Sequence, residues 1–359
     1  MIRIVGSCDQ RIFGITPAER LRRQQRQLCD QLQQSPGLTI VASASAVLSD
    51  SAVVWLLENP NRLLLTPAGR PAAMATNEAE LEGAVSAIES NGSEAGGIAP
   101  AEIGDVFVRK LRRRDTLLVR RLNEVSVRHL ERELFDTVYK GITDVVTKYV
   151  WPVPAYWVTR ICSRLHVHPN LITLIGIAAM IMATILWARG ELVAGMLFAW
   201  LMTFLDTVDG KLARVTATSS KLGDRLDHIT DIIHPPIWWA ALAYGLAGQA
   251  DPVQRPLVWG SCLIILVGYF VGRTIETAFK TRFRYNCYLW RPFDSAFRLV
   301  VSRRNIILLI MTAGLILGVP IAAFVAAAAW TLISGVIQVV RLAQAYRAGQ
   351  DGSLPSWLM

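Results

Sequence analysis

Four aspartates in one short stretch of the chain have the spacing of a metal site. Asp206 and Asp209 stand three residues apart, and Asp227 and Asp231 stand four residues apart. Residues at these spacings share one face of a helix. Each pair lies where an apolar run meets a short polar loop, so two antiparallel helices can bring the four carboxylates together. The spacing therefore predicts one acidic cluster at the end of a helix pair.

A cluster of carboxylates beside hydrocarbon needs a cation, because an isolated carboxylate is costly in an apolar medium. Carboxylate oxygens are hard ligands that suit Mg²⁺ or Mn²⁺, and no cysteine or histidine completes a zinc-type set here. Helix capping or ion pairing with nearby Lys and Arg explains one or two acidic residues, but not four at these intervals. We therefore predict that Mg²⁺ or Mn²⁺ is bound by Asp206, Asp209, Asp227 and Asp231.

Small and basic residues beside the aspartates indicate that a phosphate group lies against this segment. Gly210 follows the second aspartate, and Gly223 stands one helical turn before the third, so the backbone is open at both places. Ala213 is small for a similar reason. Arg214 can bind phosphate through two nitrogen atoms at once. The substrate that these residues predict carries phosphate, as a nucleotide does.

The combined pattern resembles the signature of the CDP-alcohol phosphatidyltransferase family. It reads D-x-x-D-G-x-x-A-R from Asp206 to Arg214 and, after eight further residues, G-x-x-x-D-x-x-x-D from Gly223 to Asp231. Pro169-Asn170 with Thr173 is also similar to the start of the first membrane span in that family. The resemblance covers about residues 140–345. It implies metal-dependent transfer of a phospho-alcohol group from a CDP-alcohol to an acceptor hydroxyl, with release of CMP.

The resemblance implies a role for each residue of the signature. Asp206, Asp209 and Asp227 would bind the metal, and Asp231 would be the general base and would also touch the metal. The CDP group would be held by Gly210, Ala213, Arg214 and Gly223, with Thr173 as a further binding residue. The members of the family are commonly homodimers, and the same is expected here.

Arginines further along the chain are candidates for binding an anionic acceptor. Arg273 lies inside an apolar run, where a charged residue is functional by default. Arg303 and Arg304 precede the next apolar run, where they equally fit a signal for membrane topology. Arg341 is a further candidate near the end of the last apolar run.

The N-terminal region bears on the choice of acceptor. Arg11-Ile12-Phe13-Gly14 and the stretch 19–23 resemble the opening of the nucleotidyltransferase domain in bifunctional inositol-phosphate cytidylyltransferases fused to a di-inositol-phosphate-phosphate synthase. The Gly-rich loop and phosphate-binding lysine of that domain are absent, so we expect a degenerate domain. Phospho-alcohol transfer should then survive deletion of residues 1–105.

Three functions remain open from the sequence. The first is transfer with an inositol-phosphate-like or other polyol-phosphate partner, which makes a phospholipid or a polyol phosphodiester. The second is a phospholipid synthase that uses CDP-diacylglycerol with glycerol phosphate or serine. The third, of another class, is a membrane transporter whose carboxylates bind a cation in transit. The transporter reading leaves the G-x-x-A-R part of the signature unexplained.

Composition places the chain in a membrane. Hydrophobic residues make up 52% of the 359 residues, the mean hydropathy is +0.36 and the net charge is +9. Apolar runs flanked by arginine indicate a lipid bilayer as the partner of this basic chain, not nucleic acid. The five cysteines form no C-x-x-C pair and are predicted to be free thiols.

Six apolar runs predict an α-helical, multi-pass protein of the inner or cytoplasmic membrane. They cover residues 170–188, 192–209, 225–247, 256–278, 305–319 and 321–343. Loops on the side of the N-terminus carry ten basic residues, and loops on the other side carry two. By the positive-inside rule, the N-terminal domain and the aspartates then face the cytoplasm.

The rest of the chain divides into three further segments. Residues 1–105 alternate short apolar strands (2–5, 38–42, 63–65) with helical stretches (17–34, 50–57, 77–88), which predicts a small soluble α/β domain. Residues 106–168 are a basic linker with an interfacial amphipathic helix at 146–165. The membrane domain is 169–345, and residues 346–359 form a tail.

Overall fold

The computed structural model describes residues 1–29, 37–90, 96–108, 111–219, 221–349 and 352–359, without the side chains of residues 29, 221, 222, 224, 226 and 227. The chain forms two compact units. The first consists of Met1–Lys140, Tyr156–Pro169 and Gly210–Ser219, and the second of Gly141–Ala155, Asn170–Asp209 and Ser220–Met359. Arg109 and Lys110 of the basic linker therefore lie outside the described residues.

The first unit contains a four-stranded sheet in the order β1-β2-β5-β4. Its strands are β1 (Ile2–Val5), β2 (Thr39–Ser43), β4 (Leu63–Leu65) and β5 (Pro71–Thr76). β1 runs parallel to β2, whereas β5 runs antiparallel to both of its neighbours.

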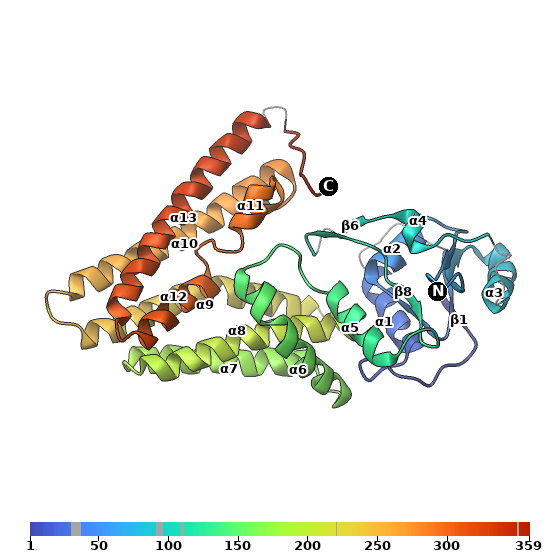
Figure 1. The fold of residues 1–359 in the computed structure, drawn as a ribbon, viewed down its shortest axis with the longest axis horizontal. Helices are drawn as coiled ribbons and strands as arrows, with labels where there is room; N and C mark the ends of the chain where they lie inside the picture. Colours follow the sequence, from blue (N-terminus) through green and yellow to red (C-terminus); the bar gives the residue numbers. More distant parts are fainter. Residues whose placement is uncertain (30–36, 91–95, 109–110, 220, 350–351) are drawn as a thin grey trace. The chain divides into compact units, whose positions relative to one another are not determined.

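Helices cover both faces of this sheet (Figure 1). Ile40 and Ala42 of β2 pack with α1 (Pro17–Cys29) and α2 (Asp50–Glu58). Val41, between them, packs on the other face with α3 (Leu81–Glu89). This alternation is the two-residue period of a strand with both faces buried.

All the strands and helices predicted for this region are present, and the small N-terminal sheet is confirmed. The end of the predicted helix 17–34 lies outside the described residues. The alanine-rich strand β5 was not predicted, since alanine has little strand preference. The other elements are β3 (Ala46–Leu48), η1 (Glu78–Glu80), α4 (Pro100–Ile103), β6 (Val106–Val108), β7 (Arg113–Asp115), β8 (Val119–Arg121) and α5 (Val127–Thr137).

The first unit continues past residue 105. β3 pairs with β8, which joins residues 46–48 to residues 119–121 in one antiparallel ladder. The helix predicted at 146–165 is present as a π-helical turn, η2 (Val146–Val150), followed by α6 (Pro152–Arg164). Its place at the membrane interface stays a prediction. The assignment of residues 1–105 as a separate soluble domain stays a prediction.

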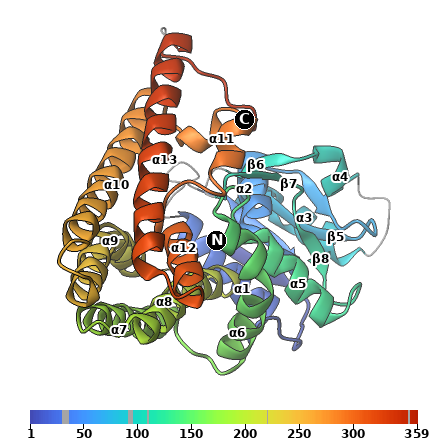
Figure 2. The same cartoon turned by 60° about the vertical axis from the view of Figure 1, so that its left-hand side comes forward.

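The second unit is helical, and each of the six apolar runs falls on one helix. These helices are α7 (Pro169–Ala188), α8 (Leu192–Val215), α9 (Lys221–Gln249), α10 (Arg255–Phe283), α12 (Arg304–Ile316) and α13 (Pro320–Ala348). The short elements η3 (Cys287–Leu289) and α11 (Pro292–Phe297) lie between α10 and α12 in the chain. α10 and α13 pack side by side, as Figures 1 and 2 both show.

Within the described residues, α7, α8, α10 and α13 are long and apolar enough to cross a membrane. α12 is a shorter apolar helix. A mostly helical chain with several candidate spans is therefore confirmed, and the count of six spans stays a prediction.

The core of the helical unit centres on Trp187. Its side chain is fully buried, its indole N–H donates to the Leu192 carbonyl (3.2 Å), and its ring packs against those of Trp238 and Trp239. Gly245 lies against the Trp187 backbone so closely that a Cβ there would stand 1.9 Å from the Trp187 carbonyl oxygen. Glycine is therefore required for α9 to approach α7 at this point.

A buried carboxylate joins three segments of the first unit. Glu131 on α5 is 1% exposed. One of its oxygens accepts from the Phe13 amide (3.2 Å), and the other accepts from Nε of Arg160 on α6 (2.6 Å). Phe13 has a positive φ of 47°, so this bond holds a strained turn in place.

Replacing Glu131 by alanine should destabilise the first unit by about 3 kcal/mol, because the substitution leaves the Arg160 charge and the Phe13 amide unpaired. Glu133→Ala is the matched control, since Glu133 pairs with Arg120 nearer the surface, and it should cost less than about 1 kcal/mol. Unfolding in detergent, followed by circular dichroism, measures both. Equal losses would contradict the structural role of Glu131.

Candidate active site

One arginine holds two of the predicted metal ligands together. Asp206 lies on α8, Asp231 lies on α9, and Arg304 is the first residue of α12. The two terminal nitrogens of Arg304 donate to Oδ2 of Asp206 (2.6 Å) and to Oδ1 of Asp231 (3.3 Å). Two carboxylates on different helices are thus close enough to share a single cation.

The other two predicted ligands are placed differently. Oδ2 of Asp209, on α8, accepts a hydrogen bond of 2.6 Å from the hydroxyl of Thr173 on α7. Asp227 lies on α9 one turn before Asp231, but its side chain is outside the described residues. In the described part of the chain, no three His, Cys, Asp or Glu side chains gather as metal ligands. The four-carboxylate metal site stays a prediction.

His234 completes the surroundings of Arg304. Its Nε2 lies 3.2 Å from an Arg304 nitrogen, and its Nδ1 lies 2.6 Å from the Thr230 carbonyl oxygen. A guanidinium only donates, so Nε2 must accept and Nδ1 must carry the proton. His234 is therefore a neutral partner that fixes the direction of Arg304.

Two consecutive prolines leave the backbone of α9 incomplete beside Asp231. Pro235 and Pro236 have no amide N–H, so the carbonyls of Asp231 and Ile232 lack their helical donors. Water cannot replace those donors in a bilayer.

Side chains of α10 supply the missing donors. The Tyr269 hydroxyl lies 3.2 Å from the Asp231 carbonyl oxygen and 2.9 Å from that of Ile232, and an Arg273 nitrogen donates to Asp231 (3.0 Å). Nε of Arg273 also donates to the Tyr269 hydroxyl (3.3 Å). Arg273, predicted as an acceptor-binding residue, thus supports the backbone of Asp231.

A buried junction fixes the start of α12, from which Arg304 projects. Oδ1 of Asp144 accepts from the Asn305 side-chain amide (2.9 Å) and from the Thr147 backbone amide (3.0 Å). The Val145 amide donates to the Leu299 carbonyl (3.0 Å). Burial opposes ionisation of Asp144, but the positive charge of Arg298 and these hydrogen bonds outweigh it and hold the pKa of Asp144 below its ordinary value.

Two more arginines lie against one tyrosine near this junction. The guanidinium groups of Arg298 and Arg303 lie 5.6 and 5.7 Å from the centre of the Tyr288 ring. Arg303 pairs with Glu276, which also accepts from the Tyr288 hydroxyl (3.1 Å). Arg298 is 8% exposed, and its Nε and one terminal nitrogen have no hydrogen-bond partner among the described residues. This region therefore offers buried donors to an anion.

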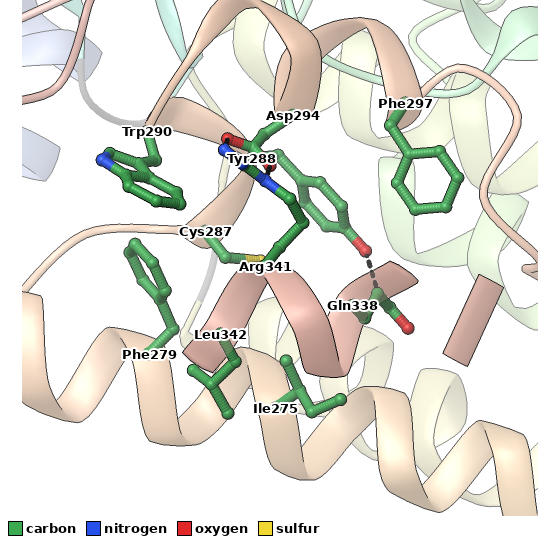
Figure 3. Close-up of a pocket in the computed structure, with 10 residues that line it drawn as sticks. All are labelled: Ile275, Phe279, Cys287, Tyr288, Trp290, Asp294, Phe297, Gln338, Arg341 and Leu342. Carbon is green, nitrogen blue, oxygen red and sulfur yellow. Dashed lines mark hydrogen bonds and ion pairs between the residues drawn. The ribbon is translucent and has the colours of Figure 1, made fainter. Parts of the chain in front are cut away.

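Arg341 is held by an ion pair. Its guanidinium donates two hydrogen bonds of 2.7 Å to the carboxylate of Asp294 on α11 (Figure 3). Its charge also lies 4.3 Å from the centre of the Trp290 ring. The observed role of Arg341 is to tie α13 to α11 in an aromatic pocket, and acceptor binding by it stays a prediction.

The predicted nucleotide-binding residues of α8, which form the nucleotide-binding half of the signature, lie at the C-terminal end of that helix, in the first unit. They are Gly210, Ala213 and Arg214. The side chains of Arg214 and Lys211 both donate to the Val138 carbonyl at the end of α5, at 2.9 and 3.0 Å. Gly210 and Ala213 are half-buried on the same helix, and Gly223 is half-buried on α9. Their roles in binding CDP stay predictions.

A comparison with protein families decides the class of the helical part. Residues 166–343 match the sequence model of the CDP-alcohol phosphatidyltransferase family, and this range contains both halves of the signature. Residues 166–343 therefore form a domain of the CDP-alcohol phosphatidyltransferase family. With several helices suited to a bilayer, this member of the family is an integral membrane protein.

Two curated relatives of this chain are phosphatidylinositol phosphate synthases. The protein of Mycobacteroides abscessus is 31% identical over 84 residues, which are 21% of this chain and 38% of that protein. The protein of Streptomyces avermitilis is 31% identical over 106 residues, which are 29% of this chain and 41% of that protein. The chain thus spans well under half the length of either relative.

Solved structures of the phosphatidylinositol phosphate synthase of Mycobacterium tuberculosis are also similar to this chain. The structure with CDP-DAG bound aligns over 52% of this chain and 92% of that chain, with 21% sequence identity and a TM-score of 0.42. The structure with manganese and citrate aligns over 52% and 88%, with 22% identity and a TM-score of 0.41.

Sequence reasoning missed several residues that support the candidate site. Tyr269 and His234 contact predicted site residues or their backbone, and Asp144 binds Asn305, the neighbour of Arg304, yet none of the three is part of the signature. The Pro235-Pro236 pair was a usable signal, because two free carbonyls inside an apolar helix require donors from a neighbour. Asn305, the partner of Asp144 on α12, lies 161 positions along the chain, too far for any local pattern to reveal.

Tyr269→Phe should destabilise the protein by about 1–3 kcal/mol, because it removes a donor from carbonyls that have no helical partner. Pro236→Ala returns an amide N–H to the Ile232 carbonyl, so the double variant should recover part of this loss. Tyr244→Phe, at an exposed tyrosine of α9, is the control. A double-mutant cycle of unfolding midpoints in detergent measures the coupling. A coupling of zero would mean that Tyr269 does not replace the proline-removed donors.

Proposed function

We propose that this chain is a membrane enzyme that transfers the phosphatidyl group of CDP-diacylglycerol to a hydroxyl of an inositol phosphate and releases CMP. The observation that carries the proposal is the family match over residues 166–343, which includes all eight fixed positions of the signature. Both curated relatives are phosphatidylinositol phosphate synthases, which supports a phosphatidylinositol phosphate as the product.

A divalent cation fits the residues present. Asp206 and Asp231 lie on different helices and already bind one positive group, the guanidinium of Arg304. Asp209 presents its carboxylate on the same helix as Asp206 and is held by Thr173. All of these donors are hard oxygens, the ligand type of Mg²⁺ and Mn²⁺. We infer that these three carboxylates, with Asp227, hold the cation.

A bound divalent cation would neutralise the diphosphate and make its phosphorus easier to attack. Gly210, Ala213, Arg214 and Gly223 bind the cytidine diphosphate part of the donor in this proposal. Asp231 takes the proton of the acceptor hydroxyl. The hydroxyl oxygen bonds to the β-phosphorus, the bond from that phosphorus to the bridging oxygen breaks, and CMP leaves with that oxygen.

The cations around Tyr288 support a phosphate-bearing acceptor. Arg298 has two buried donors without a partner among the described residues, and leaving such donors unpaired is costly. The guanidinium of Arg303 lies against the same Tyr288 ring. Arg303 is next in sequence to Arg304, which binds Asp206 and Asp231. A phosphate on the acceptor would supply oxygens for these donors. Serine carries no phosphate, so this arrangement favours an inositol phosphate or glycerol phosphate over serine.

The orientation in the membrane follows from charge. We infer that α9 and α12 complete six spans, so that both termini lie on one side. The aspartates share that side with most of the basic loop residues, which favours the cytoplasm. A homodimer is also proposed, on the resemblance to the family alone.

Asp231→Asn should lower CMP release at least about a hundredfold, because a positioned general base contributes roughly that much or more. The assay uses purified protein, Mg²⁺, labelled CDP-diacylglycerol and inositol phosphate. Asp251→Asn, at an exposed acid beyond the end of α9, is the control and should keep full activity. Full CMP release by the Asp231 variant would show that its proposed role is wrong.

A substrate screen separates the remaining possibilities. CDP-diacylglycerol and CDP-inositol are each offered with inositol phosphate, glycerol phosphate and serine. We expect CMP release with CDP-diacylglycerol and inositol phosphate. Release only with glycerol phosphate or serine would replace the acceptor, and release only with CDP-inositol would replace the donor.

A further inference from the structure

The C-terminal end of α8, which carries the nucleotide-binding half of the signature, has carbonyl groups that the helix itself cannot satisfy. The chain ends α8 with a Schellman motif: Ala217 has a φ of 50°, its amide donates to the Arg214 carbonyl (3.3 Å), and the Thr218 amide donates to Ala213 (2.8 Å). The Thr216 amide donates to Leu212 (3.1 Å). The carbonyl oxygens of Val215 and Thr216 still need hydrogen-bond donors.

Helix α1 of the N-terminal region supplies those donors. Nε of Arg20 donates to the Val215 carbonyl (3.0 Å), and Arg23 donates to the Thr216 carbonyl (3.2 Å). The side-chain amide of Gln27 donates to the Ser219 carbonyl (3.2 Å). These residues recur at intervals of three and four, so they share one face of α1. All of them lie in the same compact unit as residues 210–219.

Arg20 is buried and uses its side-chain donors for the Val215 carbonyl and for one other carbonyl. It is 2% exposed, and one of its terminal nitrogens donates to the Leu48 carbonyl (2.6 Å). Gln24, next on the same face, donates to the Leu48 carbonyl (3.2 Å) and to Oδ1 of Asp50 (2.6 Å). A buried guanidinium is costly unless its donors are used, so Arg20 holds the end of α8 and the end of β3 in a fixed relation.

The end of α5 holds another part of the same segment. The Val138 carbonyl, at the C-terminal cap of α5, accepts from both Lys211 (3.0 Å) and Arg214 (2.9 Å). The Lys211 ammonium also lies 3.4 Å from the centre of the Tyr139 ring. The segment from Gly210 to Ser219 is thus held by side chains of α1 at its end and by the end of α5 along its length.

We propose that α1 positions the nucleotide-binding part of the signature, and that Arg20, Arg23 and Gln27 are positioning residues for the CDP donor. This rests on the proposed function, because it takes Gly210, Ala213 and Arg214 as the groups that bind CDP. The N-terminal region then serves the transfer reaction even without an activity of its own. From the sequence we expect transfer to survive deletion of residues 1–105, whereas these contacts predict that it does not.

The test uses the full-length protein and measures the KM and kcat for CDP-diacylglycerol at saturating inositol phosphate and Mg²⁺. Arg23→Gln combined with Gln27→Ala should raise the KM for the donor roughly tenfold, because small misplacements of binding groups are costly. The KM for inositol phosphate should stay within about twofold, since the acceptor-binding residues lie elsewhere. When the double variant carries Arg23→Lys in place of Arg23→Gln, most of the affinity for the donor should return, because lysine still donates to the Thr216 carbonyl.

Glu19→Gln is the matched control. Glu19 pairs with Arg23 on the exposed side of α1, so this variant removes the ion pair but keeps the contact with Thr216. Its KM for the donor should equal that of the wild type. Arg20 is left unchanged in the main experiment, because its burial means that its loss could prevent folding. Unfolding midpoints of all variants are measured alongside.

The possible results separate the positioning role of α1 from the proposed function. A donor KM for the double variant equal to that of Glu19→Gln overturns the positioning role and leaves the proposed function standing. A second outcome is a lower kcat, a higher KM for both substrates and a lower unfolding midpoint, without rescue by Arg23→Lys. This outcome would show a merely structural contact and would also overturn the positioning role. Wild-type protein that releases no CMP with any donor and acceptor overturns the proposed function, and this inference with it.

Discussion

The site depends on one electrostatic constraint, the need to place carboxylates among apolar helices. Asp206 and Asp231 meet this constraint by sharing the guanidinium of Arg304, which comes from a third helix. Because charge in an apolar medium must be balanced, the positions of α8, α9 and α12 are coupled through this single group. Any cation that binds the aspartates joins a site whose charges are already arranged.

The surrounding polar contacts make that arrangement precise. Pro235 and Pro236 remove two helical donors beside Asp231, and side chains of α10 replace them, so the backbone of α9 is fixed where its carboxylate projects. Asp144 binds Asn305 and thereby fixes the start of α12 beside Arg304. In each case a group that would be unsatisfied in an apolar medium is bound by a side chain from another helix.

The N-terminal region acts on the other half of the signature by the same principle. The end of α8 leaves carbonyl oxygens without helical donors, and α1 provides arginine and amide donors for them. A degenerate nucleotidyltransferase-like domain is predicted to have lost its nucleotide loop, yet the retained helix makes these contacts.

The sequence alone determined the family, the aspartate spacing and the six helical runs, because helix periodicity and a signature within 26 residues are local properties. Only the tertiary structure decided which groups satisfy the buried charges and carbonyls. Arg304 meets Asp206 across 98 positions of the chain, and Arg20 meets Val215 across 195. Local patterns show that a buried carboxylate or a proline-freed carbonyl needs a partner, but the packing of distant helices chooses the partner.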